Sequence, residues 1–216
     1  MTARDALLDG LMRRHGRTFT EDLGLDQSRN TPSVLFRWLC AALLASARIS
    51  ADIALKAAEE LAKAGWTPPR KLVDGTWQAR VDALGRAGYV RCDESTSREL
   101  GALAEKVLGD YGGDLRRLRT AAERDPAAER RLLTEFTGVG PVGADIFLRE
   151  VQAAWDELHP CADRRALDAA KRLGLPETAE GLAELVPRAD FPRLVAALVR
   201  ADLAGEDAES LRKAAG

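Results

Sequence analysis

The stretch from Leu132 to Val151 reads LLTEFTGVGPVGADIFLREV and decides the fold of this chain. Apolar residues recur every three or four positions on both sides of the Gly-Val-Gly turn, which predicts two amphipathic helices joined by a short hairpin. Gly138 and Gly140 can adopt positive φ angles without a Cβ penalty. Pro141 suits the first turn of the second helix, because an N–H there would have no helical partner.

This hairpin has two interpretations. The N–H groups at the start of the second helix point outward, and a turn without side chains can approach a phosphate closely, so the hairpin can bind an anion. Alternatively, the glycines only permit a tight turn between two packed helices. The spacing alone leaves both interpretations open.

The rest of the chain has the same helical periodicity and lacks alternating Val, Ile and Thr runs, so we expect an all-α fold. The segment 16–32 has the weakest helical pattern and is expected to be a linker. The apolar helix containing Trp38 to Ala45 should lie at the centre of the core, and Trp66, Trp77 and Trp155 should pack at helix ends. Helices are expected over residues 3–15, 33–46, 50–64, 69–73, 76–86, 93–111, 114–122, 126–136, 142–155, 164–173, 178–185, 190–202 and 206–214.

Composition limits the classes of function. The 216 residues are 46% hydrophobic and 31% charged, which suits one compact domain or two small lobes with a real core. The net charge of −2 excludes binding to polyanions through bulk charge, so any nucleic-acid site must be a local patch.

Targeting signals and cysteine pairs are not evident. The longest apolar run, Trp38 to Ala45, is well short of the roughly 18 residues that span a bilayer. The first ten positions include the charged residues Arg4, Asp5 and Asp9, whereas a signal peptide would have an apolar stretch there. We therefore expect a cytoplasmic protein without a membrane segment. Three distant cysteines, Cys40, Cys92 and Cys161, argue against a disulfide framework and supply no CxxC pair for a metal.

The hairpin resembles the helix-hairpin-helix of the endonuclease III family of DNA glycosylases. A second motif lies in register with it, because Asp163 stands 23 residues beyond Gly140 and opens the segment DRRALDAAKRLGL. Two weaker similarities lie upstream, in the segment Leu39 to Ser50 and in the Gly-aromatic turn at Ala87 to Arg91. The hairpin positions that carry the resemblance are Leu132, Leu133, Phe136, Gly138, Val139, Gly140 and Ala144.

The resemblance implies a glycosylase fold of two helical lobes with DNA lying across a cleft between them. Residues 33–144 would form a helical barrel lobe with the hairpin at its end, and residues 1–32 with 145–216 would form the second lobe. A further crossing point is expected near His159 and Pro160.

The resemblance assigns the chemistry to Asp163. Cleavage of an N-glycosidic bond passes through an oxocarbenium-like sugar, which a nearby carboxylate stabilises while it orients water. The alternative role of Asp163 is a helix N-cap, and both roles can coexist. The other acidic residues in this region are expected on solvated helix surfaces, namely Asp145, Glu150, Asp156, Glu157 and Asp168.

The chain departs from the family pattern in two places. Bifunctional members carry a nucleophilic lysine two residues after the second glycine, and Val142 stands here, so a monofunctional glycosylase that uses water is expected. The four cysteines of the family's iron–sulfur cluster are also absent, since no cysteine follows Cys161. No cofactor or metal is therefore expected, although hairpin carbonyls can hold a cation.

DNA contacts are expected from the backbone of Gly138, Val139 and Gly140 and from several basic residues. Arg48 occupies the position of a residue that fills the gap left by an extruded base; its alternative role is an ion pair with Asp52. Arg164 and Arg165 are candidate phosphate contacts, although such clusters are often only solvated faces. The candidates for a base pocket are His159, Cys161 and Tyr89.

Three functions remain open at this point. The first is a monofunctional DNA glycosylase of base excision repair, acting on double-stranded DNA as a monomer associated with the nucleoid. The second is a noncatalytic helix-hairpin-helix module that binds DNA. The third is a helical domain whose hairpin binds protein. Only the enzyme needs a base-sized pocket beside Asp163.

Overall fold

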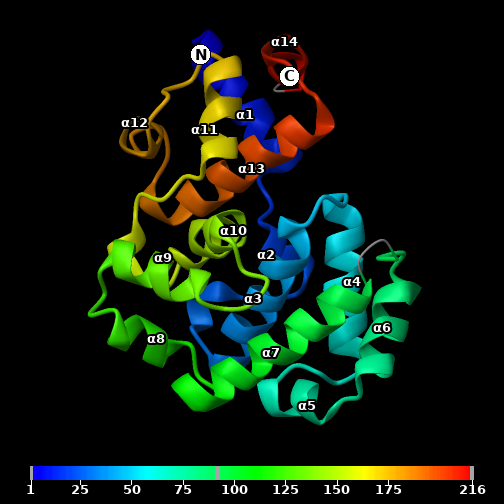
Figure 1. Cartoon of the computed structure of the whole chain (residues 1–216). Coiled ribbons are helices and arrows are strands. Elements are labelled where there is room, and N and C mark those ends of the chain that lie inside the picture. Colours follow the sequence, from blue (N-terminus) through cyan, green and yellow to red (C-terminus); the bar gives the residue numbers. More distant parts are fainter. Residues whose placement is uncertain (1, 91–92, 215–216) are drawn as a thin grey trace. The chain divides into compact units, whose positions relative to one another are not determined.

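The computed structural model describes residues 2–90 and 93–214, and every regular element within these ranges is a helix (Figure 1). The predicted all-α class is therefore confirmed. The described residues form two compact units: a terminal unit, Met1–Asp22 with Leu158–Gly216, and a central unit, Leu23–Glu157. Within the described residues, no helix combines the length and apolar character needed to cross a membrane.

The terminal unit is assembled from both ends of the sequence. Helix α1 packs on α13 and α14, and α11 also packs on α13. Leu11 and Phe191 are fully buried in this core. Its elements are α1 (Ala3–His15), α2 (Phe19–Asp22), α11 (Arg164–Arg172), α12 (Ala179–Ala183), η3 (Arg188–Asp190), α13 (Phe191–Ala204) and α14 (Ala208–Lys213).

The central unit surrounds α3, the apolar helix that the sequence predicts at the core. Helix α3 contacts α4, α7 and α10, and its residues from Trp38 to Leu44 are buried. The indole of Trp38 donates to the carbonyl of Phe147 at 3.1 Å and so ties α3 to α10. The elements are η1 (Gln27–Arg29), α3 (Pro32–Ser46), α4 (Ala51–Lys63), α5 (Pro69–Asp74), α6 (Trp77–Arg86), α7 (Asp93–Tyr111), α8 (Arg116–Ala121), α9 (Pro126–Thr134) and α10 (Pro141–Val151). A short turn of 3-10 helix, η2 (Asp156–Leu158), spans the boundary between the units.

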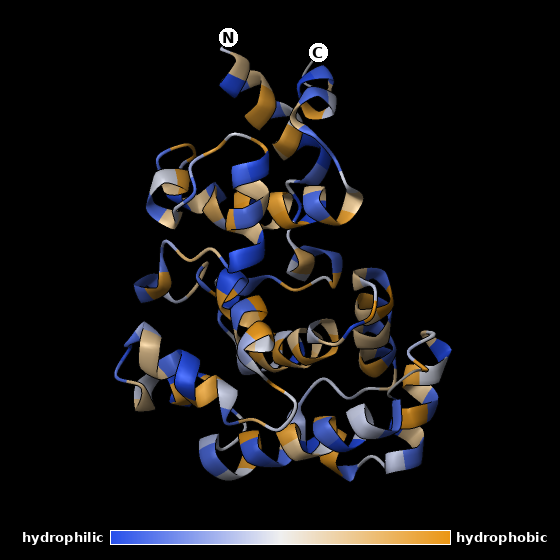
Figure 2. Ribbon diagram, turned by 45° about the horizontal axis from the view of Figure 1, so that its top comes forward, coloured by the Kyte–Doolittle hydropathy of each residue, from blue (hydrophilic) through white to orange (hydrophobic). Residues whose placement is uncertain are grey.

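Most helices carry hydrophobic and hydrophilic residues in alternation along their length, as amphipathic helices do (Figure 2). A buried cation connects three of them. Arg80, on α6, is 8% exposed and donates to the carbonyls of Leu72 at 3.0 Å, Gly75 at 2.7 Å and Ser97 at 3.0 Å. One guanidinium thus satisfies backbone acceptors at the end of α5 and on α7.

The units begin and end at other residues than the sequence suggests. The first boundary lies before Leu23 rather than before Ser33, and η1 in this segment packs on α3. The second lies after Glu157 rather than after Ala144, because α10 packs on α3 and α9 and so belongs to the central unit.

The expected linker 16–32 is more ordered than its composition indicates, since it contains α2 and η1. Asn30 ends η1 in the left-handed region, with φ of 45°, and its side-chain oxygen accepts a hydrogen bond from the indole of Trp155 at 3.1 Å. Trp155 is fully buried, which confirms its predicted packing role, although α10 already ends at Val151.

Candidate functional site

The hairpin forms as the sequence predicts. Helix α9 ends at Thr134, and the N–H of Val139 donates to the carbonyl of Phe136 at 3.0 Å to close the turn. Gly140 is the N-cap of α10, with Pro141 in the first turn, and no side chain caps this end of the helix. The first N–H groups of α10 therefore have no partner within the helix and remain available to an external acceptor.

The two hairpin glycines have different requirements. Gly138 has a φ of +83°, and a Cβ there would lie 3.0 Å from atoms of Glu99 and Leu43. Gly140 has a φ of −80°, and a Cβ there would meet nothing within 4 Å. Gly138 is thus required by the fold of the turn, whereas the space in front of Gly140 is open to a ligand.

The side chains of the hairpin anchor it and leave its backbone exposed. Phe136 and Val139 are each 2% exposed, so Val139 can offer only its backbone to a ligand. Val142, in the first turn of α10, is 58% exposed. Position 142, where the sequence resemblance leads one to look for a lysine, therefore holds a solvent-facing apolar side chain.

Arg48 belongs to the same region of the central unit. It follows the end of α3, and a Cβ at Gly143 of α10 would lie 3.5 Å from the Cβ of Ser46. The end of α3 therefore lies beside the start of α10. Arg48 is exposed, and within the described residues no ion pair joins it to Asp52, the alternative that the sequence left open.

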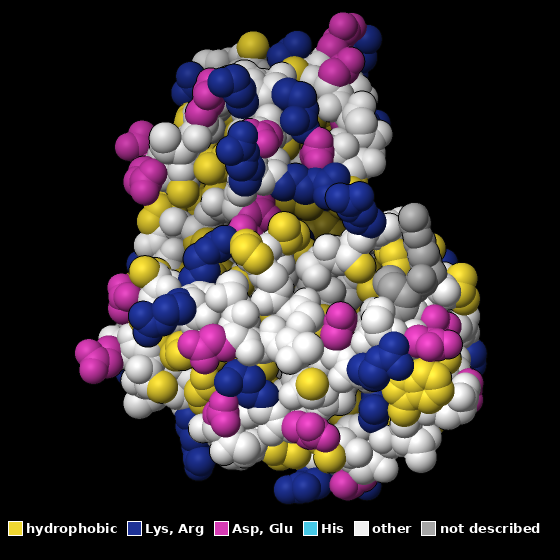
Figure 3. Space-filling view, viewed as in Figure 1, with side chains coloured by type: hydrophobic (Ala, Val, Ile, Leu, Met, Phe, Trp, Pro, Cys, Tyr) yellow, Lys and Arg dark blue, Asp and Glu magenta, His cyan; other side chains and the backbone are white. Residues whose placement is uncertain are grey.

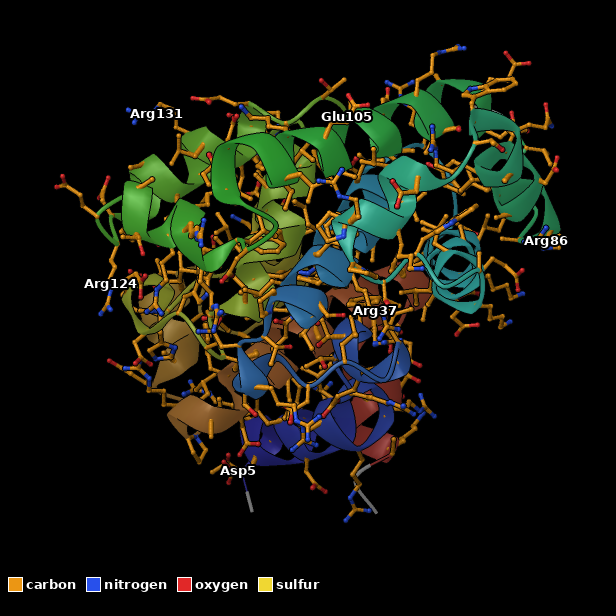
Figure 4. All side chains as sticks on the ribbon, turned by 90° about the horizontal axis from the view of Figure 1, so that it is seen from below. Asp5, Arg37, Arg86, Glu105, Arg124 and Arg131 are labelled. Atoms are coloured by element: carbon orange, nitrogen blue, oxygen red, sulfur yellow. The ribbon has the colours of Figure 1, made fainter. Side chains whose placement is uncertain are left out.

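The charges around the hairpin are mixed. Arg130 of α9 forms an ion pair with Asp145 of α10, so Asp145 is not a simply solvated charge. Arg131 points away from α9 into solvent (Figure 4). The half-buried Glu99, on α7, lies against Gly138; its carboxylate beside the turn is a feature that the sequence motif does not reveal.

Asp163 lies in the terminal unit as the N-cap of α11. Its Oδ1 accepts a hydrogen bond from the N–H of Ala166 at 2.9 Å, and the residue is half-buried. The predicted capping role is confirmed.

The loop before Asp163 contains two of the pocket candidates. His159 and Cys161 are half-buried, and the His159 ring meets Phe191 edge to face with centroids 5.0 Å apart. The peptide bond between His159 and Pro160 is cis. Tyr89 lies instead in the core of the central unit, fully buried, with its hydroxyl donating to the carbonyl of Leu44 at 3.2 Å.

Arg164 and Arg165 are exposed on α11, which carries four basic residues and one acidic residue. Figure 3 shows Lys and Arg side chains with Asp and Glu side chains among them on the surface of this face. Arg164 contacts Asp168 at 3.4 Å, and its side chain is 89% exposed. Arg165 is bound more firmly, because its Nε lies 2.6 Å from Asp202, which also pairs with Arg172. Of the two, Arg164 is the more available for an external anion.

Two acidic residues were wrongly expected on solvated surfaces. Glu150, on α10, is 1% exposed. Glu157 forms a bidentate ion pair with Arg119, with both N–O distances at 2.5 Å. Both corrections have one cause: helical periodicity does not show which polar residues a neighbouring element covers.

The cysteines do not suit a four-cysteine iron–sulfur cluster. Cys40 lies inside α3, where burial raises the pKa of its thiol to about 12, and Cys161 lies in the loop before α11. Cys92 falls outside the described residues. Within the described ranges, no group of three or more His, Cys, Asp or Glu side chains is placed to hold a metal ion.

Comparison with known proteins supports the fold. One similar solved structure is an endonuclease III–DNA covalent intermediate, trapped in an estranged-adenine complex; its TM-score is 0.56 at 17% identity, over 93% of this chain and 86% of that chain. Another is a non-covalent endonuclease III–DNA complex, with a TM-score of 0.56 at 16% identity and the same coverage. No protein-family model and no curated protein matches the chain. The chain thus has an all-α, endonuclease III-like fold.

Proposed function

We propose that this protein is a monofunctional DNA glycosylase, which hydrolyses the N-glycosidic bond of a damaged or modified base in double-stranded DNA. The observation that carries the proposal is the hairpin, where an uncapped helix N-terminus meets open space in front of Gly140. The solved structures with a similar fold are complexes with DNA, which supports DNA as the partner. We also expect a monomer in the cytoplasm, associated with the nucleoid.

In this proposal the hairpin binds a backbone phosphate, which positions the duplex without reading its sequence. Arg48 fills the gap left by the extruded base, and the absence of the alternative ion pair with Asp52 within the described residues suits that role. Arg164 adds a further phosphate contact from α11. His159 and Cys161 remain candidates for the base pocket.

Asp163 provides the chemistry. The N-glycosidic bond breaks with its electron pair leaving on the base, and the negative charge of Asp163 stabilises the oxocarbenium-like sugar. A water molecule oriented by the carboxylate then adds to the anomeric carbon, and the proton that this water loses is taken up by the departed base. The hydrogen bond from Ala166 fixes the carboxylate at the start of α11. Val142 supplies no amine, which favours water over a protein nucleophile.

The direct test is to incubate the purified protein with duplexes that each carry one lesion and then to cleave abasic sites with alkali. Strand breaks at one lesion class would support the enzyme and identify its substrate. Tight duplex binding without base release across a broad panel would favour the noncatalytic DNA-binding module instead.

Replacing Gly140 with leucine should weaken binding to damaged and undamaged duplexes alike by roughly tenfold, because the lost contact is to phosphate. The slope of log affinity against log salt should stay nearly unchanged, because the lost contact is made by neutral backbone N–H groups and releases no counterion. A Cβ at Gly140 meets nothing within 4 Å, so the variant should fold, with a melting temperature lower by only a few degrees because leucine is a poorer N-cap than glycine. Fluorescence anisotropy at several salt concentrations measures both effects, and unaltered affinity in the folded variant would remove the hairpin from the interface.

Borohydride should trap no covalent adduct between the wild-type protein and DNA, because valine at position 142 cannot form an imine with the sugar. Denaturing gel electrophoresis after reduction measures this outcome. Val142→Lys is a matched variant, since the exposed site accepts a lysine and would supply the amine. A strong adduct with the wild type would contradict the monofunctional assignment.

A further inference from the structure

Glu129 is a buried carboxyl group without a hydrogen-bond donor. It lies on α9, the helix that leads into the hairpin, and is 0% exposed. Both of its side-chain oxygens are shielded from water, and neither receives a hydrogen bond from an N–H or O–H group. An ionised carboxylate in this position would lose its hydration without compensation, which is costly.

The polar neighbour of Glu129 is another carboxyl group, that of Glu157. Glu157 is fully engaged with Arg119 of α8, whose Nε and Nη2 donate to its two oxygens at 2.5 Å. The Arg119 guanidinium also lies over the Trp155 ring, 5.7 Å from its centroid. Arg119 is therefore engaged by Glu157, and its attraction for Glu129 has a smaller effect than burial and the neighbouring Glu157.

The remaining charged groups nearby do not supply a donor. Asp125, the N-cap of α9, adds negative charge, as does Asp156 beside Arg119. On α10, which packs on α9, Asp145 pairs with Arg130, and the buried Arg149 and Glu150 donate no hydrogen bond to the oxygens of Glu129. Glu129 forms no ion pair with Arg119, so its buried carboxylate and that of the half-buried Glu157 cannot both stay charged side by side, and a single shared proton provides the missing donor.

We propose that Glu129 carries a proton in the folded protein and donates it to Glu157, so that this pair forms a pH-sensitive latch that holds α9 on α8 and on the segment of Glu157. Removing the proton places the negative charges of Glu129 and Glu157 side by side. Their repulsion pushes α9 away from α8 and from the segment of Glu157. Since α9 leads directly to Phe136 and Gly138, loss of the latch loosens the support of the hairpin.

The titration of the pair has a defined direction. Burial, with the neighbouring Glu157 adding to it, raises the pKa of Glu129 from 4.5 to about 8. Burial alone would raise the pKa of Glu157 as well, but the hydrogen bonds from Arg119 lower it to about 2. Between about pH 4.5 and 8 the folded chain holds a proton that the unfolded chain has lost, so the contribution of Glu129 to stability falls as the pH rises through this window and then levels off.

The test compares wild type with Glu129→Gln, whose amide donates to Glu157 without a titrating proton. The melting temperature of the wild type, relative to the variant, should fall by about 3–5 °C per pH unit between pH 5.5 and 7.5 and level off near pH 9. Carboxyl ¹³C NMR of the full chain should show one Glu titrating with a midpoint near pH 8, and this signal should be missing in the variant.

Glu105→Gln is the matched control, because Glu105 is exposed on α7 and points into solvent (Figure 4). Its melting curve should follow the wild type at every pH. Parallel curves for the wild type and Glu129→Gln would overturn the latch. If that variant does not fold, the NMR titration of the wild type decides alone, and the absence of a glutamate midpoint above pH 6 would overturn the proposal.

Discussion

Replacing Asp163 by asparagine should lower the rate of base release by about 10²–10³-fold, the effect expected when a preorganised electrostatic group is removed from a reaction centre. The amide has nearly the same size and keeps an oxygen that accepts from the N–H of Ala166, so α11 should still be capped. Only the negative charge is lost. Folding and duplex binding should therefore survive while catalysis fails.

The assay is single-turnover base release on the preferred lesion duplex, with melting temperature and affinity measured in parallel. Asp207→Asn is the matched control, because Asp207 caps α14 of the same unit and accepts from the N–H of Ser210 at 2.8 Å. It should leave the rate of release unchanged. Full activity in Asp163→Asn would reduce Asp163 to a helix cap.

Replacing Arg80 by methionine should destabilise the protein by about 3–5 kcal/mol, the range seen when one partner of a buried polar contact is removed. The guanidinium satisfies three carbonyls from two other helices and the turn after α5, and methionine offers no donor to any of them. For a chain of this length the melting temperature should drop by roughly 6–20 °C.

Arg86→Met is the control for this loss, because Arg86 lies on the same helix and points outward (Figure 4). Its side chain is 55% exposed and pairs with Glu60 at the surface, so its removal should cost about 1 kcal/mol or less. Calorimetry on both variants measures the difference. Equal melting temperatures would show that the buried carbonyls find other donors.

The parts of the fold that the sequence predicts are those governed by local rules. The hairpin follows from glycines and a proline at fixed positions, and the structure has Gly138 at positive φ and Pro141 in the first helical turn. The core position of α3 follows from a helix that is apolar on nearly every side. The cap at Asp163 follows from an aspartate before a helical run.

The parts that the sequence does not predict depend on contacts between distant residues. Asn30 reads as a loop residue, yet it accepts a hydrogen bond from Trp155, which follows 125 positions later. Glu150 is expected as a surface charge on an amphipathic helix, but it is 1% exposed. Whether a charged residue faces water or another helix is decided by tertiary packing, which the helical period does not encode.

The division of the terminal unit between the two ends of the sequence has a consequence for protein synthesis. Helix α1 leaves the ribosome early, but its packing partners α13 and α14 begin only at Phe191 and Ala208. The central unit, Leu23–Glu157, is translated in full before them, and domains generally fold as units during synthesis. The central unit lies between α1 and its partners in the sequence, and its folding draws the two ends of that unit together. The entropy cost of bringing α1 to α13 and α14 is then lower than for an unfolded segment of the same length. We therefore expect the nascent chain to assemble from the middle outward, with α1 docking last.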